Sequence, residues 1–383
     1  MEEWKECKLK DICDYGKDRI EVSSLDNSNY ISTENMLPNR AGVTTATTLP
    51  TGEYTPSFEI DDTLVSNIRP YFKKIWKASF SGGCSADVLV FKAKENISKD
   101  YLYYVLADDE FFKYSMATSK GTKMPRGDKV SIMNYPVKLP PLPTQQKISA
   151  ILSSLDDKIE LNNKINTNLE QQAQALFKNW FVDKYEKEGT IGDYCSVKSG
   201  FAFKSAWWLD EGTKVIRIGD IEQGCLNLET CAHVATDKIE VAKDFIVHGG
   251  DLVIAMTGAT IGKFSMIPKT QEPILVNQRV GKFFLGDNPI EKVPFIYCTL
   301  KQEEVITEFI NRGQGSAQPN ISTGDILSIP CWIPNKNEID NFNKTIQPMF
   351  ETIISNQEEN RKLSVLRDSL LPKLMSGEIE VGI

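Results

Sequence analysis

The chain has 383 residues, of which 41% are hydrophobic and 25% charged, and its formal net charge is −8. This length allows two or more domains with separate cores, and the composition is that of an ordinary globular protein. The negative charge argues against a general nucleic-acid condenser, which is normally basic, but leaves room for a local basic groove.

No apolar run reaches membrane-spanning length, and the N-terminus MEEWKECKLK does not read as a signal peptide, so we expect a cytoplasmic protein with no membrane partner. Eight cysteines occur without a Cys-x-x-Cys spacing, and only two histidines, His233 and His248, are present. A structural zinc site needs about four clustered ligands of these types. The sequence therefore predicts reduced thiols and no metal site.

The first globular segment covers residues 1–143. Short runs at 62–66 and 87–92 are typical of strands, and the segment 101–114 predicts one helix. The segment ends in the proline-rich run LPPLP at 139–143. Proline disfavours helix in the residue before it, so this run predicts a stiff connection to the next element.

The segment 144–184 predicts one long helix, with Thr144 placed to cap its start and Gly189 beyond its end. Steps of four and three residues along it meet apolar side chains interrupted by two asparagines, which is typical of a coiled-coil seam. The members of this seam are Ile148, Leu152, Leu155, Ile159, Asn162, Asn166, Leu169, Ala173, Leu176 and Trp180.

The same seam recurs 194 residues later, in a second predicted helix at 335–377. Its members are Phe342, Ile346, Met349, Ile353, Asn356, Asn360, Leu363, Arg367, Leu370 and Leu374. Arg367 stands where the first copy has Ala173, which predicts a frayed or partner-facing end. Pro348 predicts a kink or a late start of this helix.

The second globular segment, residues 185–334, repeats the first. The matching runs are 9–13 with 191–195, 62–66 with 251–255, and 121–125 with 315–319, at offsets of 182, 189 and 194. Offsets that grow in small steps indicate a duplicated unit with a few loop insertions in the second copy. Each unit is a globule of mixed strands and helices followed by one long helix.

Two such helices can bury their seams on each other. If the two units are related by a pseudo-twofold axis, the helices are antiparallel, and Asn162 then faces Asn360 while Asn166 faces Asn356. A parallel pair also brings asparagines together, so this polar layer alone does not settle the direction. Roughly 36 helical residues at about 1.5 Å each give a spacer on the order of 54 Å, against about 34 Å for one turn of duplex DNA.

Catalytic motifs are absent. The run GATIGKF at 258–264 is one residue too short between its glycines for a phosphate-binding loop and lacks the Ser or Thr after its lysine. Asp61 and Asp62 with Lys73 and Lys74 resemble a nuclease pattern only weakly, and a turn beside a basic edge explains them more simply. We therefore assign no catalytic residue.

Cationic and amide side chains instead gather on predicted loops at corresponding places in the two halves. Arginine binds guanine, and asparagine or glutamine binds adenine, through paired hydrogen bonds, while lysine mostly neutralises phosphate. These clusters predict contacts to double-stranded DNA. The candidate residues are Asn67, Arg69, Tyr71, Lys73, Lys74, Lys77, Lys120, Lys123 and Arg126 in the first half, and Lys263, Asn277, Gln278, Arg279, Arg312, Gln314, Gln318 and Asn320 in the second.

Seven stretches resemble the specificity subunits of type I restriction–modification systems, and they are spread along most of the chain, from residue 66 to residue 377. They are SNIRPYFKK at 66–74, LPPLPTQQKI at 139–148, DDKIELN at 156–162, QALFKNWF at 174–181, NQRV at 277–280, GSAQPNI at 315–321 and LLPKLMSG at 370–377.

The resemblance implies an α+β chain with two tandem mixed α/β target recognition domains at 1–143 and 185–334. They are separated by two spacer helices at 144–184 and 335–377, which form an antiparallel coiled coil with pseudo-twofold symmetry. Each domain would read one half of a bipartite DNA target.

The resemblance further implies that modification subunits binding S-adenosylmethionine, and restriction subunits using ATP and Mg²⁺, supply the chemistry, with no cofactor in this chain. Two alternatives stay open: a self-contained site-specific nuclease, and a structural adaptor that never contacts DNA.

Overall fold

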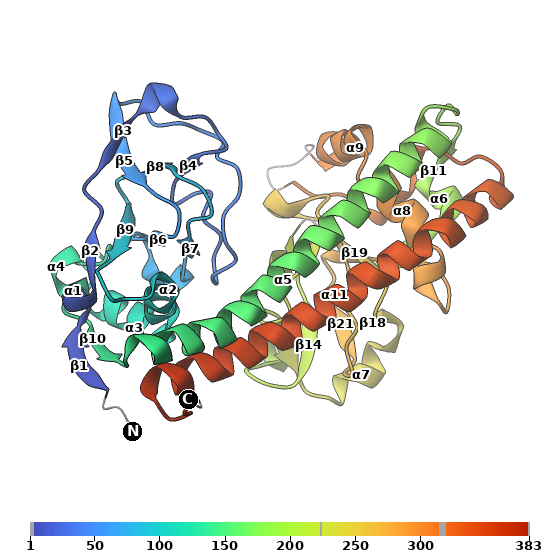
Figure 1. Cartoon of the computed structure of the whole chain (residues 1–383). Helices are drawn as coiled ribbons and strands as arrows, with labels where there is room; N and C mark the ends of the chain where they lie inside the picture. Colours follow the sequence, from blue (N-terminus) through green and yellow to red (C-terminus); the bar gives the residue numbers. More distant parts are fainter. Residues whose placement is uncertain (1–3, 223, 314–318, 382–383) are drawn as a thin grey trace. The chain divides into compact units, whose positions relative to one another are not determined.

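The computed structural model describes residues 4–222, 224–313 and 319–381. The chain divides into two compact units: unit 1 is Met1–Asp157 with Leu363–Ile383, and unit 2 is Lys158–Lys362. Both divisions fall inside the two long helices, so each unit contains a part of either helix (Figure 1).

Unit 1 contains two four-stranded sheets and a two-stranded ribbon. The first sheet has the strand order β2-β9-β6-β7 with antiparallel neighbours, and the second has the order β3-β5-β8-β4, in which β4 and β8 are parallel. β1 pairs with β10 in the ribbon. The strands are β1 Lys5–Lys8, β2 Cys13–Tyr15, β3 Arg19–Glu21, β4 Tyr30–Ile31, β5 Tyr54–Phe58, β6 Thr63–Ser66, β7 Ile75–Lys77, β8 Gly82–Cys84, β9 Val88–Ala93 and β10 Pro136–Leu139.

The helices of unit 1 cover the first sheet. They are α1 Leu9–Ile12, α2 Lys99–Ala107, α3 Asp109–Ala117 and α4 Lys129–Ile132, with the single turns η1 Val22–Ser24 and η2 Pro70–Phe72. The expectation of one helix over 101–114 is wrong. Asp108 takes an extended backbone, and its carboxylate accepts a hydrogen bond from the Glu110 amide at 3.0 Å, so it ends α2 and caps α3.

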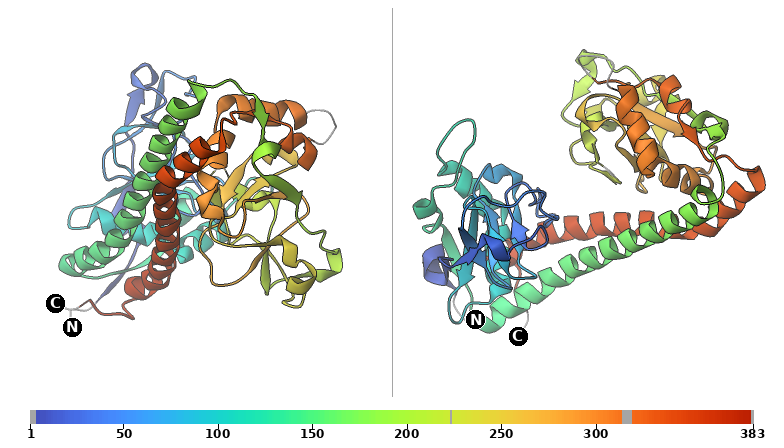
Figure 2. Two further views of the ribbon diagram at one scale, coloured as in Figure 1. Left: turned by 90° about the vertical axis from the view of Figure 1, so that its right-hand side faces the viewer. Right: turned by 90° about the horizontal axis from the view of Figure 1, so that it is seen from above.

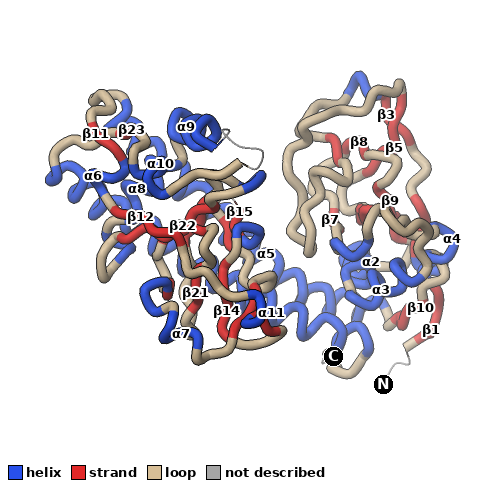
Figure 3. Tube along the Cα trace, turned by 180° about the vertical axis from the view of Figure 1, so that it is seen from behind, coloured by secondary structure: helices blue, strands red, loops and turns tan. Residues whose placement is uncertain are grey.

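Unit 2 is built on the same plan with added strands. Its first sheet has the order β12-β22-β19-β20 and its second the order β13-β17-β14-β21-β18, with ribbons β11-β23 and β15-β16 (Figure 3, red). The strands are β11 Gly189–Thr190, β12 Ser196–Ser199, β13 Trp208–Leu209, β14 Thr213–Ile216, β15 Ile221–Glu222, β16 Cys225–Leu226, β17 Ala232–Val234, β18 Ile246–Val247, β19 Leu252–Ala255, β20 Phe264–Met266, β21 Ile274–Val276, β22 Val280–Phe284 and β23 Pro330–Cys331.

The shorter helices of unit 2 are α6 Ile191–Tyr194, α7 Lys238–Val241, α8 Val293–Leu300, α9 Glu303–Gly313 and α10 Thr323–Leu327, with the single turns η4 Ser205–Trp207, η5 Ile218–Asp220, η6 Lys243–Phe245, η7 Gly258–Thr260 and η8 Pro289–Glu291. In chain order α6, α8, α9 and α10 correspond to α1, α2, α3 and α4, and the first sheets share one strand order. The predicted duplication is therefore confirmed at the level of topology.

The two long helices are α5 Leu142–Phe177, which passes into the π-helical turn η3 Lys178–Val182, and α11 Lys336–Ser376. The Thr144 amide donates to the Pro141 carbonyl at 2.9 Å, so Thr144 lies inside α5 and does not cap it as predicted. Pro143 is tolerated there because amides of the first turn have no helical partner.

Pro348 neither delays nor interrupts α11, contrary to the expectation of a late start. Asn335 precedes the helix, and its side-chain oxygen accepts from the Glu338 amide at 3.1 Å. On either side of the exposed proline, Ile346 and Phe350 are completely buried, and this packing offsets the one backbone hydrogen bond that proline cannot make.

The two long helices run antiparallel and side by side (Figure 2). In unit 2, Asn162 Nδ2 donates to Asn360 Oδ1 and Asn356 Nδ2 donates to Asn166 Oδ1, both at 2.8 Å. These are the pairs expected for antiparallel packing, and every predicted seam residue is buried or partly buried.

Arg367 of unit 1 is not at a frayed or partner-facing end, so that expectation is wrong. Its side chain is 12% exposed, and its Nη1 lies 2.7 Å from the Asp156 carboxylate of α5. The longer side chain fits the seam because Asp156 and Asp368 both pair with its guanidinium.

Candidate nucleic-acid interface

The site of unit 1 forms where the loop after β6 meets the segment before α4. The Arg69 amide donates to the Pro125 carbonyl at 2.8 Å, and the Gly127 amide donates to the Asn67 carbonyl at 3.2 Å. Ile68 and Arg126 form an antiparallel bridge between the same two segments. The structure thus brings together two clusters that are more than forty residues apart in the sequence.

A third segment, just before β9, completes this arrangement. The Asn67 amide donates to the Asp87 carbonyl at 2.8 Å. The Asp87 carboxylate in turn faces Arg126, with both Nε and Nη2 of the guanidinium at 3.2 Å from its oxygens. Sequence reasoning missed Asp87, which became apparent only from the pairing of the loops.

Unit 2 repeats the three-way junction with other side chains. The Met256 amide donates to the Arg279 carbonyl at 3.0 Å, and the Gly258 amide donates to the Pro319 carbonyl at 2.9 Å. Thr257 and Asn320 form the bridge that Ile68 and Arg126 form in unit 1. By these shared bonds Asp87 corresponds to Arg279, and Arg126 corresponds to Asn320.

The loop after β6 holds two cationic residues in the left-handed backbone region. Arg69 has φ 49° and ψ 64°, and Lys73 has φ 49° and ψ 44°. Their counterparts in unit 2 are Gly258 and Gly262, with φ 73° and 79°. This conformation costs a residue with a side chain on the order of 1 kcal/mol, whereas glycine adopts it freely. Cationic side chains retained at such a cost are typical of a functional loop.

Buried polar atoms without hydrogen-bond partners mark the same place in both units. Among the described residues they include Asn67 Oδ1 and Arg69 Nε in unit 1, and Thr257 Oγ1 in unit 2. An unsatisfied buried polar group costs about 1–3 kcal/mol, so native proteins usually keep one only where a partner completes it. The orphaned atoms are therefore available to a ligand with matching donors and acceptors.

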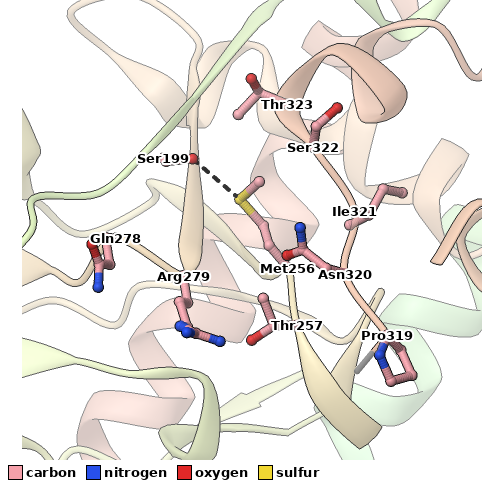
Figure 4. Close-up of a pocket in the computed structure, with 10 residues that line it drawn as sticks. All are labelled: Ser199, Met256, Thr257, Gln278, Arg279, Pro319, Asn320, Ile321, Ser322 and Thr323. Atoms are coloured by element: carbon pink, nitrogen blue, oxygen red, sulfur yellow. Dashed lines mark hydrogen bonds between the residues drawn. The ribbon is translucent and has the colours of Figure 1, made fainter. Parts of the chain in front are cut away.

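In unit 2 the junction opens into a pocket of about 580 Å³. Figure 4 shows Thr257, Arg279 and Asn320 entering it from three different segments. The Arg279 and Asn320 side chains are exposed, and Gln278 lies beside them on the turn before β22. The pocket is lined by Ser199, Met256, Thr257, Gln278, Arg279, Pro319, Asn320, Ile321, Ser322 and Thr323.

Several predicted DNA contacts of unit 1 are engaged within the fold. Lys73 pairs with Asp109 at 2.8 Å, and Lys77 pairs with Asp100 and Asp61. These ammonium groups brace α2 and α3 against the sheet, which leaves less of their hydrogen-bonding capacity for phosphate.

The two lysines at the edges of the unit 1 loops behave in the same way. Lys74 Nζ donates to the Thr33 carbonyl at 2.7 Å, and burial lowers the pKa of its ammonium group. Lys120 bonds the Asp128 carboxylate, and this hydrogen bond, with those from Ser131, lowers the pKa of Asp128 to about 2.

Other candidates divide between solvent and the interior. Tyr71 is 49% exposed beside Phe72, which is 38% exposed, and Lys123 is exposed, so Tyr71 and Lys123 are available to a ligand. Asn277 is half-buried and bridges Phe201, and Lys263 is half-buried. Arg312 bonds Glu308, the Asp325 carbonyl and Ser328, which makes it a brace between α9 and α10. Gln314 and Gln318 lie outside the described residues.

The described part of the chain contains no cluster of three or more His, Cys, Asp or Glu residues that could hold a metal ion. No described helix is long and apolar enough to cross a bilayer. Each unit presents one polar junction built from backbone-paired loops.

The chain is thus a duplicated α+β protein, in which each half of the sequence carries one such junction and one helix of the antiparallel pair. The model of the family described as type I restriction modification DNA specificity domain matches residues 1–171 and 183–366. The chain therefore belongs to this family, and each half of it is one copy of the domain.

Individual relatives agree with this assignment. The specificity subunit of the type I restriction enzyme HindI from Haemophilus influenzae is 26% identical and aligns over 99% of this chain and 100% of its own length. The MjaVIII specificity subunit from Methanocaldococcus jannaschii is 27% identical over 78% of this chain and 75% of its own length.

Among solved structures, the S subunit of a type I restriction–modification system from M. genitalium matches with a TM-score of 0.55 at 17% identity. The match covers 100% of this chain and 97% of that one, and it supports the fold.

Proposed function

We propose that this chain is the DNA-reading subunit of a type I restriction–modification complex, with each unit reading one half of a bipartite double-stranded target. The observation that carries the proposal is the recurrence of one loop junction in both units with different polar side chains. Base edges in the major groove offer the donors and acceptors that such side chains and the orphaned polar atoms lack. Two unlike junctions suit two unlike half-sites.

The same proposal assigns the chemistry to partners. Modification subunits would bind S-adenosylmethionine and methylate the DNA, and restriction subunits would use ATP and Mg²⁺, while this chain supplies no catalytic residue. The membership of the chain in the specificity family, and the names of its relatives, support this division. Free thiols at Cys7, Cys13, Cys84, Cys195, Cys231, Cys298 and Cys331 suit the reducing cytoplasm, where these partners would act.

A self-contained nuclease is the weaker alternative, because its candidate carboxylates have structural roles. Asp61 pairs with Lys77 and Lys99, and the buried Asp62 carboxylate accepts a hydrogen bond from the Glu59 amide at 2.9 Å. The same turn occurs in unit 2, where the Asp251 carboxylate accepts a hydrogen bond from the His248 amide at 2.8 Å. A turn that recurs in both units explains these aspartates without catalysis.

The decisive experiment combines the chain with its modification subunits and S-adenosylmethionine on a randomised DNA library, and maps methylation by sequencing. We expect a single split, asymmetric motif. Methylation without site preference would contradict the proposal, and magnesium-dependent cleavage by the lone chain would favour the nuclease.

The adaptor alternative is tested by charge. Lys123 and Arg279 are exposed, so Lys123→Glu with Arg279→Glu should abolish DNA binding and leave the fold intact, because phosphate contacts dominate affinity. Unchanged DNA binding by this variant would favour an adaptor. Reversing the charge of Lys73 or Lys74 is a poorer test, since it also breaks the contacts of these lysines within unit 1.

The paired helices would set the distance between the half-sites. Inserting one heptad into both α5 and α11 keeps their seam in register and should change the tolerated spacing while leaving the bases of each half-site unchanged. The same assay of methylated motifs measures both quantities, and an unchanged spacing would refute this role of the helices.

A further inference from the structure

One position of the loop junction has opposite chemistry in the two units. The residue before β9 in unit 1 is Asp87, and the residue before β22 in unit 2 is Arg279. Its carbonyl accepts from the amide of the residue that follows β6 in unit 1 or β19 in unit 2. Arg126 faces Asp87 in unit 1, and the matching bridges Ile68–Arg126 and Thr257–Asn320 make Asn320 its counterpart in unit 2. The arginine therefore occupies the position before α4 in unit 1 and the position before β22 in unit 2.

In unit 1 the two side chains satisfy each other. Arg126 uses Nε and Nη2 on the two oxygens of Asp87, both at 3.2 Å, which is the bidentate arrangement that arginine otherwise offers to a ligand. The two side chains are 53% and 35% exposed, so this neutral pair lies at the surface of the junction. An arginine fork already occupied by a carboxylate has little left for a base edge.

In unit 2 the arginine fork is free. The residues that line the pocket include no Asp or Glu, and within the part of the chain that the structure describes Arg279 makes no ion pair or side-chain hydrogen bond. The buried Thr257 hydroxyl, which has no partner, lies in the wall of the same pocket. The pocket thus combines an available double donor with a buried polar group that lacks a partner.

We propose that this pocket is a guanine-selective subsite, in which Arg279 donates to O6 and N7 of a guanine in the half-site read by unit 2. Arginine on guanine is the commonest specific contact in the major groove, and its planar fork matches those two acceptors. Gln278 and Asn320 flank Arg279 and suit a neighbouring adenine. Unit 1 lacks the subsite because Asp87 and Arg126 neutralise each other at the corresponding place.

The proposal rests on the proposed function, and the test separates the two. The full chain, assembled with its modification subunits, is assayed on the randomised library as wild type and as Arg279→Lys. Lysine keeps the charge but not the fork, so we expect overall binding to persist while discrimination for guanine at one position of one half-site falls roughly ten- to a hundredfold. The other half-site should keep its motif.

Arg217→Lys is the matched control. Arg217 is an exposed arginine of unit 2 that donates to the Thr230 carbonyl and does not line the pocket, so its replacement should leave the motif unchanged. A wild-type complex with no split motif would defeat the proposed function itself. A split motif without guanine in the half-site of unit 2, or one whose guanine requirement survives Arg279→Lys, would overturn the subsite alone.

Discussion

Arg69 of unit 1 has a left-handed backbone, and the loss of stability that this conformation causes can be measured by replacing the residue. The loop after β6 holds Arg69 at φ 49° and ψ 64° with its Nε buried and unpaired, whereas the corresponding residue of unit 2 is Gly258. We predict that Arg69→Gly stabilises unit 1 and weakens DNA binding. The two units of one chain thus provide both the strained residue and its natural relaxed counterpart.

The expected magnitude follows from four contributions. Relief of the left-handed backbone gains about 1–2 kcal/mol, and removal of the unsatisfied Nε gains about 1–3 kcal/mol. Against these, the greater unfolded-state freedom of glycine costs about 0.5–1 kcal/mol, and the partly buried alkyl chain of Arg69 loses contacts. We expect a net gain of about 1 kcal/mol, which raises Tm by roughly 2–4 °C in a unit of this size.

Differential scanning calorimetry of the full chain gives Tm, and titration of duplex DNA carrying the mapped motif gives affinity at fixed salt. Arg40→Ala is a useful opposite control, because Arg40 bonds the Ala107 carbonyl and Asp109 and its loss should lower Tm. A lower Tm for Arg69→Gly, or an unchanged DNA affinity, would refute the reasoning that strain is retained for binding.

Three further predictions concern the helical pair and the loop junction. Asn162→Leu removes a completely buried amide whose Oδ1 has no partner and whose Nδ2 donates to Asn360 and Glu359. Both acceptors are partly exposed and can bond water instead, so the free energy of unfolding of unit 2 should be unchanged or raised by up to about 1 kcal/mol, and a large loss of stability would contradict this. Cysteine cross-linking between α5 and α11 should at the same time report a less uniform register. Arg367→Met leaves the partly buried Asp156 carboxylate without its cation and should lower the free energy of unfolding, measured in urea, by about 2–3 kcal/mol. Adding Asp156→Leu to the same chain should restore most of this loss. Equal losses in the single and double variants would exclude a coupled pair. The pKa of Asp128 is lowered to about 2 in the folded chain, so its contribution to stability is present above about pH 4, the ordinary aspartate pKa, and is lost as pH falls toward 2. The difference in stability between wild type and Asp128→Asn should therefore shrink over that range. A difference that is independent of pH would be inconsistent with the Lys120 contact.

Much of the architecture could be predicted from repeated patterns in the sequence. A helix shows as apolar residues every three or four positions, and a duplicated unit shows as similar runs at a nearly constant offset. Apolar residues at steps of three and four place Ile148 and Leu152 on a buried helix face, and the shared offset of 194 predicts the paired asparagine layer. The antiparallel partners Asn162 and Asn360 followed once pseudo-twofold pairing was assumed. A duplicated seam carries this information because a helix face repeats with a fixed period.

Boundaries and local exceptions were harder to predict. Thr144 reads as a cap, yet α5 begins at Leu142, and the carboxylate of Asp108 divides one expected helix into α2 and α3. Arg367 reads as an exposed exception in the seam, yet Asp156 holds it inside. Each outcome depends on which neighbour satisfies a polar group, and a single side chain in the sequence does not reveal that neighbour.

The sequence by itself determined the duplication, the helical seam and the segments in which the basic and amide side chains of the two loop sites occur, because all three depend on spacing along one chain. Only the tertiary structure decided that the turn before β22 meets the loop after β19 and the segment before α10, and so that Arg279 faces a pocket while Arg126 faces Asp87. Those contacts join segments far apart in sequence through backbone hydrogen bonds, whose partners are chosen by the packing of the whole unit.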